Sequence, residues 1–169
     1  NEAPYPVTNS RGDEAERHQF MMDSLVAVTT LQQHLREQID LAAPTPEVAE
    51  AAEILLGDMD DGGFLETPLE DLCLSLAVPL ADLAQAKRLI NSLDPAGVGA
   101  EDLRDSLLIQ LERKGYAGRL PYRIVDLHLD ALAKRRFDEI ARALGCTARQ
   151  VADAQEEVIS CLDPRPARD

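Results

Sequence analysis

Apolar residues recur at intervals of three and four along most of the chain, which is the spacing that places them on one face of an α-helix. The first such stretch predicts a helix over about residues 14–40, broken near Asp23 and Ser24. Seven further helices are expected at about residues 46–59, 68–76, 80–92, 100–114, 121–134, 136–144 and 148–163. The pattern therefore predicts an all-α protein.

A repeat is embedded in this pattern. Seven apolar positions between Leu69 and Ile90 recur 68 residues later, between Phe137 and Val158, and Leu-Asp-Pro follows both copies. Each copy reads as a short helix, a three-residue turn and a longer helix, which is helix-turn-helix geometry. The chain is therefore expected to form two small helical bundles in tandem, over residues 20–95 and 96–166, each containing one helix-turn-helix-like unit.

Local signals refine the predicted boundaries. Residues 1–19 begin with a stretch rich in Pro, Asn and Ser and are expected to form a disordered linker. Thr67 with Glu70, and Thr147 with Gln150, have the spacing of helix capping boxes. Glu101 and Asp102 are expected in the first turn of the helix over residues 100–114, where the helix dipole favours acidic side chains.

Charge is divided unevenly between the predicted bundles. The net charge is −14, and residues 1–95 hold 18 acidic against 5 basic residues, while residues 96–169 hold 13 against 12. Proteins that grip phosphates are usually basic, so the helix-turn-helix units are interpreted as structural. A basic protein surface is the better partner for the acidic bundle. The alternative, a DNA-binding helix-turn-helix regulator fragment, stays open.

Candidate chemistry is sparse. The acidic turn at residues 58–65 begins like a calcium-binding EF-hand loop, but its fifth position is Gly62 and its twelfth is Leu69, where a bidentate Glu is needed. Neither a nucleophile elbow nor metal-ligand spacing is found, so no enzyme activity, cofactor or metal is expected; a calcium-binding helical protein remains a third hypothesis. The turn is instead a candidate protein contact, formed by Asp58, Asp60, Asp61, Phe64 and Leu65.

The cysteines and the hydropathy indicate the cellular setting. Cys73, Cys146 and Cys161 are far apart and lie in apolar helical patterns, where thiols usually pack as small hydrophobic groups. No apolar run is long enough to span a membrane, and no targeting signal is recognised at the start of the sequence. A cytoplasmic location is therefore expected.

Several strings together resemble the core-binding domain of the enhancer-dependent bacterial sigma factor, the sigma-54 family. The resemblance covers about residues 20–166, and its most specific part is the string from Leu93 to Leu103. The other strings are Leu31-x-x-His34-Leu35-x-x-Gln38-Ile39, residues 60–65, residues 107–111, Leu144-Gly145 and residues 162–166.

The resemblance implies a module that initiates transcription by tethering sigma to core RNA polymerase, mainly through the β and β′ subunits. Promoter DNA would then be bound only by parts of the full-length factor that this sequence does not contain. Phe64, Glu101 and Ser106 stand where the family usually has Tyr, Arg and Cys. Within the family string, the residues expected to set the angle between the bundles are Pro95, Gly97, Val98, Gly99, Asp102 and Leu103.

Overall fold

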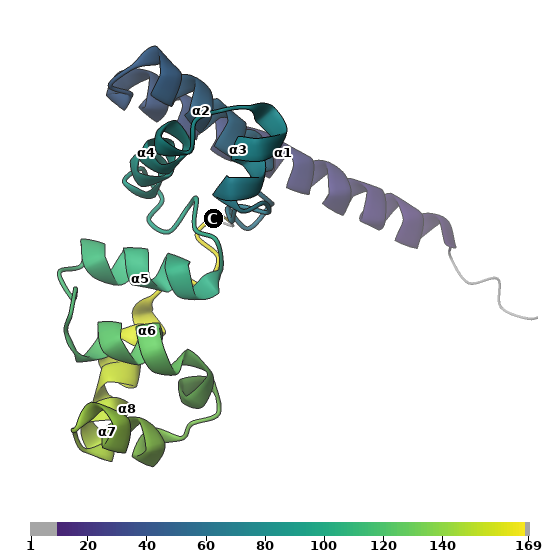
Figure 1. Ribbon diagram of the computed structural model, residues 1–169. Helices are drawn as coiled ribbons and strands as arrows, with labels where there is room; N and C mark the ends of the chain where they lie inside the picture. Colours follow the sequence, from purple (N-terminus) through teal and green to yellow (C-terminus); the bar gives the residue numbers. More distant parts are fainter. Residues whose placement is uncertain (1–9, 168–169) are drawn as a thin grey trace, which may run out of the picture.

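The computed structural model describes residues 10–167, which form eight α-helices and one short 3-10 helix (Figure 1). The first half of the molecule contains α1 (Ser10–Ala42), α2 (Pro46–Asp58), α3 (Leu69–Leu76) and α4 (Leu80–Asn91). The second half contains α5 (Leu103–Arg113), α6 (Leu120–Ala133), α7 (Phe137–Leu144), α8 (Ala148–Glu157) and the 3-10 helix Ile159–Cys161. The all-α prediction is confirmed.

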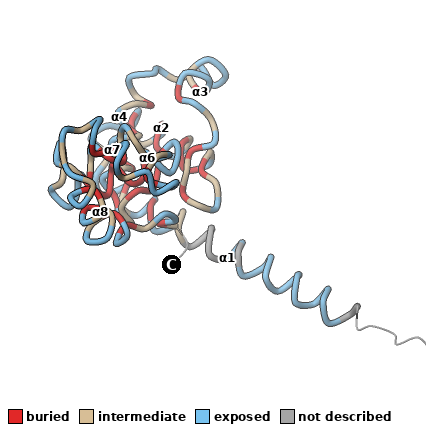
Figure 2. Tube along the Cα trace, turned by 90° about the horizontal axis from the view of Figure 1, so that it is seen from below, coloured by how far each residue is buried: buried red, intermediate tan, exposed pale blue. Residues whose placement is uncertain are grey.

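Helix α1 is longer than predicted. It begins at Ser10 and continues without a break past Asp23 and Ser24, so residues 10–19 are helical and not part of a disordered linker. The remainder of that predicted linker, residues 1–9, lies outside the described residues. The Glu, Ala, Arg and Gln residues between positions 14 and 19 are good helix formers, which accounts for the difference. The N-terminal part of α1 projects from the rest of the molecule (Figures 1 and 2).

The first half is built around α4. Helices α2 and α4 pack against each other, α1 contacts both, and α3 contacts α4. Their fully buried side chains include Leu35 and Ile39 of α1, Leu55 of α2, and Leu83 of α4. Val98 also belongs to this core, which places the end of the first half beyond the predicted boundary at residue 95.

The second half has its own core, built around α6. This helix packs against α5, α7 and α8, and α7 also packs against α8. Leu111, Ile124, Ile140 and Val151 are fully buried there. Helix α6 changes direction at His128, whose φ of −136° is not helical.

Both predicted helix-turn-helix units are present, as α3–α4 and α7–α8. Each first helix ends in a left-handed residue, Ala77 with a φ of 53° and Gly145 with a φ of 69°, and these two positions are 68 residues apart. The Thr147–Gln150 capping box is confirmed at the start of α8. The Thr67–Glu70 box is wrong, because Pro68 caps α3 without a side-chain bond.

Helix α5 begins later than expected. Asp102 is its N-cap and accepts a hydrogen bond from Asp105 N at 2.8 Å, so Glu101 precedes the helix and does not lie in its first turn. Residues 97–100 consequently precede the helix and form a linker, mostly of turns, and all four are buried. None of the helices over residues 10–167 combines the length and the apolar character needed to cross a bilayer.

Candidate protein-binding site at the junction of the two halves

The acidic turn between α2 and α3 uses the Asp58 carboxylate internally. One oxygen, Oδ2, accepts hydrogen bonds from the backbone N–H of Glu66 at 3.1 Å and of Thr67 at 2.9 Å. The other, Oδ1, accepts from the Thr67 hydroxyl at 2.6 Å. This bond explains why Thr67 does not cap α3: its side chain is turned toward Asp58. Asp58 therefore closes the turn.

Asp60 also has a structural role. Its Oδ1 accepts hydrogen bonds from Gly62 N at 2.8 Å and from Phe64 N at 2.9 Å, which is the arrangement by which Asp side chains stabilise tight turns. Asp61 is exposed on the outside of the same turn. Of the three acidic residues predicted as contacts, Asp61 is the exposed one, and Asp58 and Asp60 are half-buried.

The turn and the linker, two separate candidates in the sequence, lie against each other. Leu65 N donates to Ala100 O at 2.8 Å, and Gly99 N donates to Gly63 O at 2.8 Å. Leu65 is 6% exposed and Phe64 is half-buried, so both predicted apolar contacts pack mainly within this junction. The two halves are thus joined by backbone hydrogen bonds as well as by the chain itself.

Close packing explains the glycines of the linker. Gly97 has a φ of +96°, and a Cβ atom there would lie 2.5 Å from Ser106 Oγ. Gly99 has a φ of +76°, and its Cβ would lie 2.6 Å from Ile90 Cγ2. Both positions combine a left-handed backbone with a contact that leaves no room for a side chain. The linker is a packed element, and Gly97-Val98-Gly99 is held between α4 and α5.

Two glutamine side chains fasten the Leu-Asp-Pro segments. Gln38 Nε2 donates to Asp94 O at 2.9 Å, while Gln38 Oε1 accepts from Asp94 N at 3.0 Å. Gln110 makes the same pair of bonds with Asp163, at 2.7 Å and 2.8 Å. We call these pairs the first and second glutamine brackets. Each ties the end of a helix-turn-helix unit to the helix that opens its half.

Ion pairs between the halves reinforce the junction. Lys87 of α4 pairs with Asp105 of α5 at 3.1 Å, and both side chains are mostly buried. Arg113 of α5 donates to Asp94 Oδ1 at 3.1 Å and to the backbone oxygen of Leu93 at 2.6 Å. The second half therefore contacts the first Leu-Asp-Pro segment directly through Arg113.

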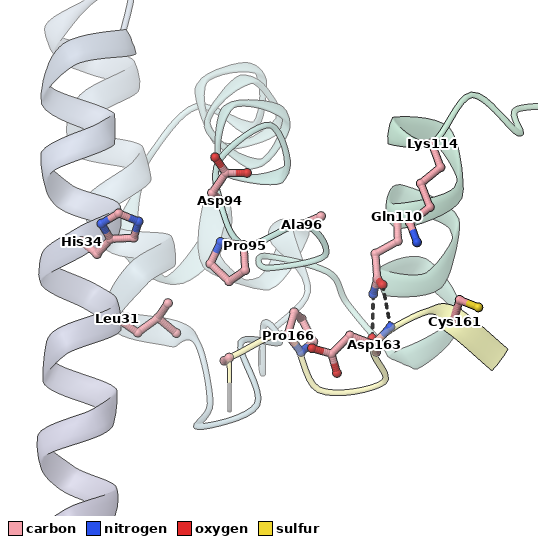
Figure 3. Close-up of a pocket in the computed structure, with 11 residues that line it drawn as sticks. Leu31, His34, Asp94, Pro95, Ala96, Gln110, Lys114, Cys161, Asp163 and Pro166 are labelled. Atoms are coloured by element: carbon pink, nitrogen blue, oxygen red, sulfur yellow. Dashed lines mark hydrogen bonds between the residues drawn. The ribbon is translucent and has the colours of Figure 1, made fainter. Parts of the chain in front are cut away.

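A groove of 720 Å³ opens beside these contacts. Figure 3 shows Leu31 and His34 of α1 on one side and Lys114 of α5 on the other, with Pro95 and Pro166 between them. The second glutamine bracket, drawn as dashed lines, lies at the edge of this groove. Its lining mixes apolar, acidic and basic side chains, so no single charge dominates it.

Comparison with known proteins decides the family. A sequence model of the family described as "Sigma-54 factor, core binding domain" matches residues 21–169 of the chain. The chain belongs to the sigma-54 core-binding-domain family.

Curated relatives of this sigma-54 core-binding domain carry the same family name. It is 33% identical over 144 residues to the RNA polymerase sigma-54 factor of Acidithiobacillus ferridurans, covering 83% of the chain and 30% of the relative. It is 31% identical over 147 residues to the RNA polymerase sigma-54 factor of Escherichia coli (strain K12), covering 82% of the chain and 30% of the relative. It is 28% identical over 138 residues to the RNA polymerase sigma-54 factor of Bacillus subtilis (strain 168), covering 81% of the chain and 31% of the relative. The chain thus spans about three tenths of their length.

The family string of this sigma-54 domain lies along the junction. Pro95 is half-buried at the groove, Asp102 caps α5, and Leu103 is 41% exposed in the first turn of α5. Sequence reasoning missed Gln38, Gln110 and Arg113 as structural residues. A signal for the glutamines was present, because Leu35-x-x-Gln38-Ile39 and Leu107-x-x-Gln110-Leu111 share their spacing.

The second helices of the two helix-turn-helix units differ from DNA-reading helices. In α4, Lys87 is held by Asp105 and so is not directed outward. In α8, Asp153, Glu156 and Glu157 are exposed. Carboxylates on this face would repel the phosphates of a duplex, which does not favour the DNA-binding alternative.

Proposed function

We propose that this sigma-54 core-binding domain is a non-catalytic module that binds core RNA polymerase in the bacterial cytoplasm and tethers its sigma factor there. The observation that carries the proposal is the family match across residues 21–169, which takes in both cores and the junction between them. The resemblance of the family string extends the proposal to a contact made mainly with the β and β′ subunits.

The charge of the first half supports a protein partner. Residues 1–95 hold 18 acidic and 5 basic side chains, and many of the acidic ones are exposed. Such a surface attracts Lys and Arg side chains and repels a nucleic acid backbone. The exposed acidic residues on α1, α2, α3 and the acidic turn include Glu37, Asp40, Glu47, Glu50, Asp61, Glu66, Glu70 and Asp71.

Within this surface, we propose the acidic turn as one contact. Asp61 supplies the charge, since Asp58 and Asp60 hold the turn in shape and Phe64 and Leu65 anchor it to the linker. Gly97, Val98 and Gly99 hold the two halves at a fixed angle, so that both can meet the polymerase at once. Their burial and close packing support this role.

The test is direct binding of the whole chain to purified core polymerase, measured by biolayer interferometry at 50 and 300 mM salt. We expect binding that weakens with salt, because opposite charges at exposed sites are screened. Asp61→Lys should weaken binding several-fold, while Asp130→Lys, an exposed acid of α6 in the second half, serves as the charge-matched control. Absence of binding at low salt would overturn the proposal, and equal affinities of the two variants would remove the turn from the interface.

A gel shift with random duplex DNA separates the alternative function. The exposed acids on α8 predict no shift at 50 mM salt. A robust shift, retained when core polymerase is absent, would support a DNA-binding module instead.

A further inference from the structure

The turn between α3 and α4 exposes an unusual amount of apolar side chain. Leu74 is 83% exposed, Leu76 is 50% exposed and Leu80 is 42% exposed, all within seven residues of the chain. Ala77, Pro79 and Ala81 lie between or next to them and are exposed as well. We call these six residues the α3–α4 tip. Large exposed apolar side chains gathered in one place, rather than scattered singly, mark interaction surfaces.

The position of the tip leaves it accessible. Helix α3 packs mainly on α4, whereas its counterpart α7 packs on both α6 and α8. Figure 2 shows the chain around α3 at the edge of the molecule, with exposed segments on its outer side. The buried face of this unit, which includes Leu69, Leu72 and Leu83, already supplies its contribution to the first core. The tip residues are therefore additional to what the core requires.

The second helix-turn-helix unit provides an internal reference for the tip. Its turn has the same left-handed residue at the same position, Gly145 in place of Ala77, so the backbone scaffold is shared. At the positions equivalent to Leu74, Leu80 and Ala81, however, it carries Arg142, Ala148 and Arg149. The scaffold thus folds with polar or small residues there. The helix-turn-helix backbone therefore does not require the apolar residues of the tip, which are specific to the surface of the first unit.

Acidic residues surround the tip and indicate the chemistry of its partner. Glu66, Glu70 and Asp71 are exposed on the loop before α3 and on its first turn, while Asp82 lies half-buried in the first turn of α4. No basic residue occurs between Arg36 and Lys87. A complementary surface would have an apolar pocket for the leucines and Lys or Arg side chains at its rim, which is the usual anatomy of a specific protein interface.

We propose that the α3–α4 tip is a docking surface for core RNA polymerase; this inference rests on the proposed function. The tip would fit an apolar pocket of the polymerase that has Lys or Arg side chains at its rim. Leu74 and Leu80 are the anchoring side chains, and the acidic residues around them orient the contact. The first helix-turn-helix unit thus binds a protein. The second unit has the same backbone arrangement but carries arginines in place of the apolar surface.

The test replaces tip residues with those that the second unit carries. In the full chain, Leu74→Arg combined with Leu80→Ala and Ala81→Arg should raise the Kd for core polymerase by about tenfold or more, as loss of central apolar anchors does. Its thermal midpoint and helical circular dichroism should stay near the parent values. Leu80→Ala alone is a milder variant that retains the charge of the tip, and a weaker loss in the same direction is expected. The matched control is Leu41→Arg, which changes a leucine that is 91% exposed at the end of α1.

The outcomes separate the two proposals. If the parent chain does not bind core polymerase, the proposed function fails and this inference fails with it. If the parent binds and the tip variants bind equally well, only the docking surface is overturned. Equal losses of affinity in Leu41→Arg and in the tip variant would also overturn it, because they would show that any exposed leucine contributes non-specifically to binding. Sedimentation of the parent chain alone must show a monomer; a dimer that the tip variant dissociates would assign the tip to self-association instead.

Discussion

Gln38 and Gln110 each hold the backbone N–H and C=O of an aspartate in a Leu-Asp-Pro segment, but they do so in different surroundings. The first bracket is solvent-accessible, while Gln110 is 5% exposed and also lies 3.3 Å from the hydroxyl of the buried Ser106. The same arrangement of hydrogen bonds thus involves an accessible glutamine in the first half and a buried glutamine in the second. The comparison teaches that the two halves share this pair of backbone connections although the burial of the glutamine that makes them differs.

The largest effect is expected from a side chain added to the linker at Gly97, where it would collide with the second glutamine bracket. Gly97→Ala would place a methyl group 2.5 Å from Ser106 Oγ and 3.0 Å from Gln110 Nε2, at a φ of +96°. Steric overlap and backbone strain together should lower the free energy of unfolding by about 3 kcal/mol. Urea denaturation measures the loss. Gly115→Ala, at a φ of +84° with open space around it, isolates the backbone strain and should cost only about 1 kcal/mol.

Removing the glutamines tests the difference in burial directly. Gln110→Ala leaves the N–H and C=O of Asp163 without their partner in a partly buried setting, and should lower the free energy of unfolding by about 2 kcal/mol. Gln38→Ala should cost under about 1 kcal/mol, because water can replace its bonds to Asp94. Parallel urea titrations compare the two. Equal losses would show that both brackets are equally shielded from water.

The left-handed turns offer a smaller, reciprocal test. Ala77 has a φ of 53° and Gly145 a φ of 69° at equivalent positions, so the first unit bears a strain that the second avoids. Ala77→Gly should raise the free energy of unfolding by about 0.5 kcal/mol, and Gly145→Ala should lower it by about 1 kcal/mol. Thermal melts of both variants provide the measurement. Changes of the same sign in both would contradict the equivalence of the two turns.

The smallest effect concerns the bond between the first two helices of each half. Arg36 of α1 pairs with Glu53 of α2 at the surface, whereas Tyr122 of α6 donates to Glu112 of α5 at 3.1 Å. Burial, the bond to Glu112 and the nearby carboxylates raise the pKa of Tyr122 above 10.0. The resulting stabilisation is complete below pH 10.0 and is lost as the pH rises through the folded-state pKa.

Replacing the acceptor checks this assignment. Glu112→Gln removes the negative charge beside the phenol and should lower the pKa of Tyr122 toward 10.0. The carbon chemical shift of the Tyr122 ring, followed by NMR against pH, reports the change. An unaltered titration midpoint would show that burial alone, and not Glu112, sets this pKa.

Much of the fold was predictable because it depends on local patterns. The apolar periodicity predicted the eight α-helices of residues 10–167, and the repeat predicted the two helix-turn-helix units. The Thr147–Gln150 box was correct, since both partners lie within one helical turn. The Thr67 box was wrong because Asp58, nine residues earlier, binds the Thr67 hydroxyl in the folded chain. Competition from a distant side chain cannot be seen in a four-residue pattern.

The junction was harder to predict for the same physical reason. Gly97 and Gly99 looked like a turn in the sequence, but their burial depends on α4 and α5 closing on them. Asp58 and Asp60 looked like surface charges, and only the folded turn shows that backbone N–H groups occupy their oxygens. The α3–α4 tip escaped notice because exposure of a leucine is decided by which helices pack around it.

The burial of residues 97–100 has a consequence for how the molecule can be cut. Connections between two cores are ordinarily where proteases cleave first, because such segments are exposed and can adopt the extended form that an enzyme cleft requires. Here that stretch is hydrogen-bonded to the acidic turn and shielded by both halves. Limited digestion should therefore trim the projecting end of α1 well before it parts one core from the other.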